Sequence, residues 1–143
     1  MKKLLVSACL LGVPCRYDGK SKPDGRVLRL QDGYELIPVC PEQLGGLPTP
    51  RTPCEIKNGA VQTQDGTDRS AEYHLGAKKA LARYQDLGCT GAVLKKNSPS
   101  CGKGLIYDGS FQKTLVCGNG VTAQLLLDEG IPVYTEDETE NLI

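Results

Sequence analysis

Residues 70–94 read SAEYHLGAKKALARYQDLGCTGAVL, and this stretch predicts the class of fold. Apolar side chains recur at helical spacing through residues 70–87: Tyr73, Ala77, Ala80, Leu81, Tyr84 and Leu87. Gly88 follows as a helix stop, and residues 89–94 form a short apolar run that is typical of a strand. A helix that leads through a tight turn into a buried strand is half of a β–α–β unit.

Similar signals lie on both sides of this stretch. Residues 4–8 and 35–39 predict two earlier strands, residues 121–129 predict a second helix, and residues 132–134 predict a last strand. Strands that alternate with helices favour a mostly parallel sheet with right-handed crossovers. We therefore expect an α/β protein, a three-layer Rossmann-like or flavodoxin-like fold with helices on both faces of the sheet. Without repeats or linker-like segments, residues 1–143 are expected to form one domain.

The remaining segments predict shorter elements. Residues 26–30 suit a short helix, and residues 55–62 suit a hairpin whose Asn58-Gly59 pair fits a type I′ turn. Residues 45–53 form a Gly- and Pro-rich loop, and a loop of that length needs a functional reason to be ordered. Residues 136–143 are expected to be a frayed or short helical tail.

Charge and hydropathy argue against two classes of partner. The chain has 17 basic and 17 acidic side chains and no charged block, so neither a nucleic acid nor an anionic membrane is an expected partner. Its apolar runs are too short to cross a bilayer. The N-terminus faintly resembles a signal peptide, but Cys9, Pro14, Cys15 and Arg16 stand where a cleavage site would be needed. We expect a cytoplasmic protein; the sequence does not indicate an oligomeric state.

Seven cysteines are the unusual feature of the composition. Their number is odd and no secretion signal precedes them, so a disulfide framework is disfavoured. Taken singly, a cysteine is most often a small buried apolar residue. That interpretation is preferred for Cys54, Cys89 and Cys117.

The other four cysteines lie where predicted strands run into loops: Cys9, Cys15, Cys40 and Cys101. In an open parallel sheet, ligands bind outside the carboxyl ends of the strands, where these loops converge. Paired Cys-x-x-Cys spacings are absent and the single histidine, His74, is in mid-helix, so we assign His74 no role and do not expect zinc. Thiolate-only ligation favours an iron–sulfur cluster, while a nucleophilic cysteine would lack an obvious base.

Glu42 lies two residues after Cys40, so in an extended segment the two side chains point the same way. A carboxylate beside a metal cluster can serve as a general acid or base. The equally weighted alternative is a loop carboxylate that pairs with Arg51 or Lys96.

The segment after residue 94 carries further polar groups. Ser98 and Ser100 flank Pro99, where a serine commonly stabilises a turn. Lys95 and Lys96 are interpreted as a solvated pair.

Several motifs together resemble the 2-thiouracil desulfurase family, over essentially the whole chain. The motifs that carry the resemblance are VSACLLG (6–12), CRYDG (15–19), CPE (40–42), GGL (45–47), Pro50-Arg51, Leu94-Lys95, SPSCG (98–102) and GVTA (120–123).

The resemblance implies a [4Fe–4S] cluster held by three of Cys9, Cys15, Cys40 and Cys101, with one iron left open as a Lewis acid. It also implies that Glu42 and Ser98 act on the substrate. The implied activity is the non-redox conversion of a small thiolated pyrimidine, such as 2-thiouracil, to uracil and sulfide. Two alternatives stay open: an iron–sulfur redox sensor or cluster carrier without a substrate, and a metal-free α/β binding module.

Overall fold

Four parallel strands form the central sheet of the computed structural model, which describes residues 1–143. Their order is β2-β1-β5-β8, with bounds Lys2–Ser7 (β1), Tyr34–Val39 (β2), Gly91–Leu94 (β5) and Val133–Thr135 (β8). All three neighbouring pairs run parallel. The sequence predicted each of these strands to within a few residues, and the mostly parallel sheet is confirmed.

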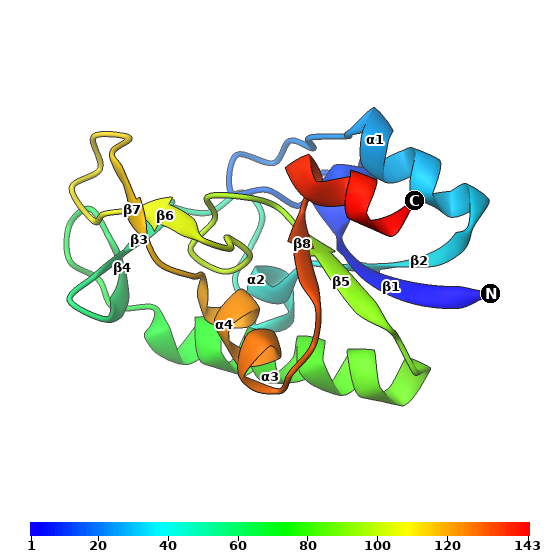
Figure 1. The fold of residues 1–143 in the computed structure, drawn as a ribbon. Helices are drawn as coiled ribbons and strands as arrows, with labels where there is room; N and C mark the ends of the chain where they lie inside the picture. Colours follow the sequence, from blue (N-terminus) through cyan, green and yellow to red (C-terminus); the bar gives the residue numbers. More distant parts are fainter.

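Helices cover both faces of the sheet (Figure 1). One face is covered by α3 (Ser70–Leu87) and α4 (Val121–Asp128). The other is covered by α1 (Gly25–Leu28) and by the 3₁₀ helices η2 (Arg29–Asp32) and η3 (Glu136–Leu142). The expected three-layer α/β fold is therefore confirmed. None of the helices combines the length and the apolar character that crossing a membrane requires.

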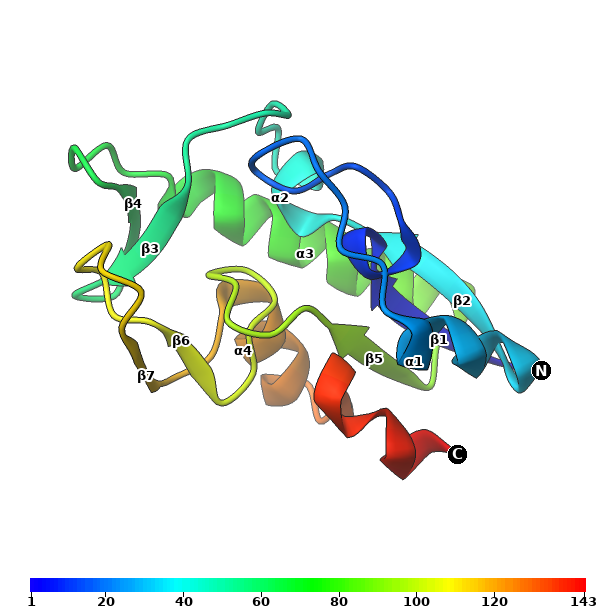
Figure 2. The same cartoon turned by 90° about the horizontal axis from the view of Figure 1, so that it is seen from above.

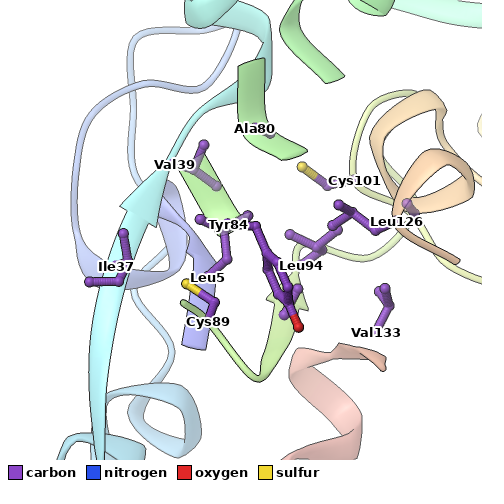
Figure 3. Packing of buried hydrophobic residues seen from close by; sticks show 12 residues of the cluster. Leu5, Ile37, Val39, Ala80, Tyr84, Cys89, Leu94, Cys101, Leu126 and Val133 are labelled. Carbon is purple, nitrogen blue, oxygen red and sulfur yellow. The ribbon is translucent and has the colours of Figure 1, made fainter. Parts of the chain in front are cut away.

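The continuous apolar run of β1 follows from burial on both faces. Leu5 faces α3 and α4, where it joins Tyr84, Leu94 and Leu126 in one apolar cluster (Figure 3). Leu4 and Val6 alternate to the other face and pack against residues such as Val27. This alternation fixes the register of the central strands, because a slip by one residue would exchange the two faces.

The predicted short helix and C-terminal tail are both present. Residues 25–32 form α1 and η2, and Asp24 caps α1 by accepting the backbone N–H of Arg26 at 2.9 Å. The tail begins with a capping box. The Thr135 side chain accepts a backbone N–H from the first turn of the tail, and the Glu138 side chain accepts the backbone N–H of Thr135.

Two hairpins lie side by side at one end of the molecule (Figures 1 and 2). The first, β3 (Cys54–Lys57) and β4 (Ala60–Thr63), turns through Asn58 and Gly59, whose φ angles of 53° and 79° confirm the type I′ prediction. The second, β6 (Leu105–Tyr107) and β7 (Leu115–Cys117), was not predicted. Its β7 strand is exposed along its length, so the expectation that Cys117 is buried is wrong.

Two short elements at the carboxyl edge of the sheet also differ from the prediction. Strand β1 ends at Ser7, one residue before the predicted end at residue 8, because the chain bends into the 3₁₀ helix η1 (Ala8–Leu11). Gly12, at a φ of 96°, closes that turn. The second element is α2 (Pro41–Leu44), a single helical turn with Pro41 at its first position. Both elements carry residues of the candidate site.

Candidate active site

A cavity of about 160 Å³ opens at the carboxyl ends of β1, β2 and β5. After β1 the chain runs to one face of the sheet, and after β5 it runs to α4 on the other face. The cavity lies where these two connections diverge. All six candidate residues line it: Cys9, Cys15, Cys40, Glu42, Ser98 and Cys101. The structure thus brings together residues that are up to 92 positions apart in the chain (Cys9 to Cys101).

Hydrogen bonds of the backbone hold the first two cysteines in place. The carbonyl of Cys9 accepts the N–H of Lys22 at 2.9 Å, which folds the long loop after η1 back onto it. Within that loop, the carbonyl of Cys15 accepts a hydrogen bond from Nη2 of Arg51 at 2.9 Å. Arg51 therefore connects the loop after β1 to the loop after α2.

Ser98 shapes the segment that carries Cys101. Its Oγ accepts the backbone N–H groups of Ser100 and Cys101, each at 3.0 Å. Ser100 is fully buried and hydrogen-bonds Thr122 on α4 at 2.9 Å. The turn-stabilising role considered for Ser98 is thus present, and its hydroxyl hydrogen remains available for a ligand in the cavity.

The thiols lie close to one another; those of Cys9, Cys15 and Cys101 are buried, and that of Cys40 is partly buried. The pKa of Cys15 is raised to about 11: its contact with the Cys40 thiol lowers the pKa, but contact with the Cys9 thiol and burial outweigh that. Hydrogen bonding to Cys15 and burial raise the pKa of Cys40. Burial raises the pKa of Cys101 to about 12, although the Ser7 hydroxyl acts in the opposite direction. Without a cation, these groups are neutral thiols at physiological pH.

The donor set suits an iron–sulfur cluster. All seven cysteines are unpaired, and four of them face one cavity without a histidine. No three His, Cys, Asp or Glu side chains are gathered closely enough for a single metal ion, whereas the ligands of a larger cluster stand further apart. The cavity is also lined by Arg16, Arg51, Lys95 and Lys96 against the one carboxylate of Glu42. Three of these cations are paired with carboxylates: Arg51 with Glu42, Lys95 with Glu136 and Lys96 with Asp137. Arg16 is the cation of the wall without an ion pair.

Glu42 is held by two donors on the same oxygen. Its Oε1 accepts hydrogen bonds from Nε of Arg51 at 3.0 Å and from the hydroxyl of Tyr73 at 2.7 Å. Its Oε2 accepts no hydrogen bond from the protein, although the side chain lines the cavity. Of the two pairings considered from the sequence, the one with Arg51 forms; Lys96 instead pairs with Asp137 at 2.8 Å. The helical spacing in the sequence predicts only a packing role for Tyr73.

Lys95 is not the solvated residue that the sequence suggested. Its side chain is 18% exposed, lines the cavity, and places Nζ 2.9 Å from Oε2 of Glu136, which is itself buried. The backbone N–H of Lys95 donates to Oγ of Ser7 at 2.9 Å and joins the ends of β5 and β1. Ser7 ends β1, and Lys95 directly follows β5. These places at strand ends are the sequence signal by which both residues could have been found.

Together, this fold and this site define an α/β protein with a thiol-lined cavity at the carboxyl edge of its sheet. Comparison with known proteins gives the family: the model of the 2-thiouracil desulfurase family matches residues 4–138. The chain belongs to that family.

Two related proteins match over nearly their full lengths. An uncharacterized protein of Bacillus subtilis (strain 168), YbbK, is 39% identical over 150 residues, which cover 98% of this chain and 99% of that protein. A solved structure of the [4Fe-4S]-dependent thiouracil desulfidase TudS is 44% identical, with a TM-score of 0.92 over 99% of this chain and 95% of that one. The resemblance found in the sequence motifs is thereby confirmed.

Proposed function

We propose that this chain is a [4Fe–4S]-dependent desulfurase that converts a thiolated pyrimidine, such as 2-thiouracil, to the oxo compound and sulfide. The observation that carries the proposal is the convergence of four thiols, a carboxylate and a serine hydroxyl on one cavity. The similarity to TudS, a [4Fe-4S]-dependent thiouracil desulfidase, supports the cofactor and the substrate class. A small molecule, and not a nucleic acid, is the expected partner of a cavity of this size.

Cys9, Cys40 and Cys101 are the proposed cluster ligands. They follow β1, β2 and β5 respectively, so each approaches the cavity from a different strand end. Cys15 belongs to the same connection after β1 as Cys9, and it contacts both the Cys9 and Cys40 thiols. It would approach a cluster from the same direction as Cys9, so we do not propose it as a ligand. When bound, the cluster supplies an iron without a protein ligand, a soft Lewis acid suited to a thiocarbonyl sulfur.

Glu42 is the proposed general acid–base. Water adds its oxygen to the ring carbon while Oε2 of Glu42 takes one of its protons. The carbon–sulfur bond then breaks, Oε2 returns that proton to the departing sulfur, and the second proton of the water passes to solvent, so that sulfur leaves as hydrosulfide. Arg51 and Tyr73 occupy Oε1, so the oxygen that exchanges protons is the one without a protein donor. Sulfur enters and leaves in the same oxidation state, so the reaction needs no reductant.

Ser98 is the proposed hydrogen-bond donor to the substrate. Its oxygen is occupied by the N–H groups of Ser100 and Cys101, which directs the remaining hydroxyl hydrogen away from that turn. Desulfuration also explains the cavity better than a redox sensor or cluster carrier does. A sensor has no need of an oriented carboxylate with a free oxygen beside its thiols.

The decisive experiment is anaerobic purification followed by measurement of iron, acid-labile sulfide and activity. We expect about four iron atoms per chain and equal yields of uracil and sulfide from 2-thiouracil without added reductant. A Cys15→Ser variant should keep its iron, whereas Cys9→Ser should lose it. A fully loaded protein that releases no sulfide from any thiolated pyrimidine would favour the sensor or carrier instead.

We also propose a cytoplasmic location. Seven unpaired cysteines are typical of a reducing compartment, and an iron–sulfur cluster with an open iron is best preserved there. Fractionation of cells that express the tagged protein would test this location.

A further inference from the structure

Tyr73 contacts the site without entering the cavity. The residue is 2% exposed, lies in the first turns of α3, and is absent from the cavity wall. Its hydroxyl nevertheless donates to Oε1 of Glu42 at 2.7 Å, which is shorter than the 3.0 Å bond from Arg51. Tyr73 therefore acts on the site only through Glu42.

The ring of Tyr73 is itself fixed by the first hairpin. Tyr73 forms a small buried cluster with Cys54 of β3 and Val61 of β4. The side chain of Cys54 contacts the Tyr73 hydroxyl, and burial together with Glu42 raises the pKa of Tyr73, so the phenol stays a donor. The hairpin thus supports the residue that holds the carboxylate.

Direct backbone contact between α2 and α3 sets the spacing of this pair. A Cβ atom on Gly45 would lie 2.0 Å from the carbonyl oxygen of Glu72, and one on Gly76 would lie 1.9 Å from that of Pro41. Gly45 is three residues after Glu42, and Gly76 is three residues after Tyr73, so each glycine lies on the same helical face as its partner. Side chains at these positions would separate the two helices.

The short helix needs such support. Helix α2 is a single turn of four residues, which is too short to be stable by itself. A carboxylate on an isolated turn would sample several rotamers, and only some of them direct Oε2 into the cavity. Two donors from different segments restrict the carboxylate to one orientation: Arg51 from the following loop and Tyr73 from α3.

We propose that Tyr73 is a positioning residue for desulfuration, which holds Oε1 of Glu42 so that Oε2 faces the reacting atoms. The inference rests on the proposed function, because it gives Glu42 the acid–base role. It adds a residue remote from the cavity to the machinery and assigns a role to α3 and the first hairpin.

The test is Tyr73→Phe in the cluster-loaded enzyme, with Tyr84→Phe as a matched control. Tyr84 is also buried on α3, and its ring packs in the apolar cluster without contact to the cavity. We expect Tyr73→Phe to lower kcat about tenfold or more with iron content and KM nearly unchanged, since it removes one hydrogen bond to a charged group. Tyr84→Phe should keep the parent kcat. Equal kcat values for Tyr73→Phe and the parent would overturn the proposal.

A double substitution separates positioning from general weakening of the fold. If Tyr73 acts through Glu42, then adding Tyr73→Phe to Glu42→Gln should cost little further rate, whereas independent effects would multiply. Fully multiplicative losses would contradict the proposal.

Crystal structures of the loaded enzyme provide a readout apart from activity. In Tyr73→Phe, the Glu42 carboxylate should rotate or occupy several positions, and an unchanged single orientation would overturn the positioning role. If the parent enzyme releases no sulfide, the proposed function fails, while these structures still decide whether Tyr73 orients Glu42.

Discussion

Cys89 and Cys101 belong to the same apolar cluster but lie at opposite edges of the sheet (Figure 3). Cys89 precedes β5 at the amino edge, where a single turn links α3 to the strand. Cys101 lies in the longer segment after β5, at the carboxyl edge, and lines the cavity. Both are buried, so burial alone does not distinguish a packing thiol from a functional one. The two thiols are distinguished by the edge of the sheet at which each one lies.

The surroundings of the two thiols differ in the same way. Burial raises the pKa of Cys89, and its charged neighbours, such as Lys3 and Arg83, belong to the surface. Burial also raises the pKa of Cys101, but its neighbours are Ser7, Cys40 and Glu42, which line the cavity. The thiol at the amino edge therefore packs among apolar and surface residues, whereas the thiol at the carboxyl edge lies among the groups of the proposed site.

The largest expected contrast is the loss of iron in Cys101→Ala. Removing a thiolate at the carboxyl edge should abolish cluster retention and with it sulfide release, because three protein ligands are the minimum proposed here. Cys89→Ala, the matched change at the amino edge, should retain the parent iron content. Iron and sulfide analysis after anaerobic purification measures both. Equal iron contents in the two variants would break the comparison.

Glu42→Gln should keep the cluster and lose most of the rate. The amide has the shape of the carboxylate but cannot exchange a proton, and general acid–base groups contribute roughly a hundred- to ten-thousand-fold. Steady-state assays of variants matched for iron content measure the effect. Sulfide release at the parent rate would remove Glu42 from the mechanism.

Ser98→Ala should have an intermediate effect that divides between rate and cluster retention. The substitution leaves two backbone N–H groups, those of Ser100 and Cys101, without their acceptor. Each unsatisfied donor costs about 1–3 kcal/mol if it stays buried. We expect a rate loss of roughly ten- to a hundredfold and faster loss of iron on exposure to a chelator. A variant that loses rate but holds iron as firmly as the parent would assign Ser98 to the substrate alone.

The smallest expected effect is that of Cys89→Ala on stability. The lost packing should cost about 1–2 kcal/mol. The fold raises the pKa of this thiol above its ordinary value of 9.0, so the protonated form is favoured and its contribution is present below that pH and lost as the pH rises. The variant should therefore lose less stability than the parent between about pH 8 and about pH 10. Urea unfolding of the metal-free proteins at both pH values measures this difference, and equal losses would contradict it.

Sequence patterns were sufficient for the elements that have a period. Helix α3 was predicted with its observed bounds because Tyr73, Ala77 and Ala80 repeat at helical spacing and Gly88 ends it. Helix α2 and the β6–β7 hairpin are elements of three or four residues that show no period, and they were missed. Strands β5 and β8 are equally short, but each is an apolar run that follows a predicted helix. Cys117 was wrongly expected to be buried, because its exposure depends on a hairpin that was not foreseen.

The candidate site divides along a similar line. The sequence indicates the four cysteines, Glu42 and Ser98 because each lies near the end of a predicted strand or within a motif. The link from Tyr73 to Glu42 spans 31 positions and two helices, so only the folded structure reveals it. Lys95 was misinterpreted because its partner, Glu136, lies 41 positions further along the chain.

The contact between Gly45 and Gly76 has a consequence for protein engineering. Replacing a glycine by alanine inside a helix is a standard way to stabilise a protein, and it commonly gains about 0.5–1 kcal/mol. At Gly76 the same change would push α3 away from α2, because the added methyl group would overlap the carbonyl of Pro41. In a library that randomises α3, His74, Leu75 and Lys78 are exposed and should vary freely, while position 76 should return as glycine.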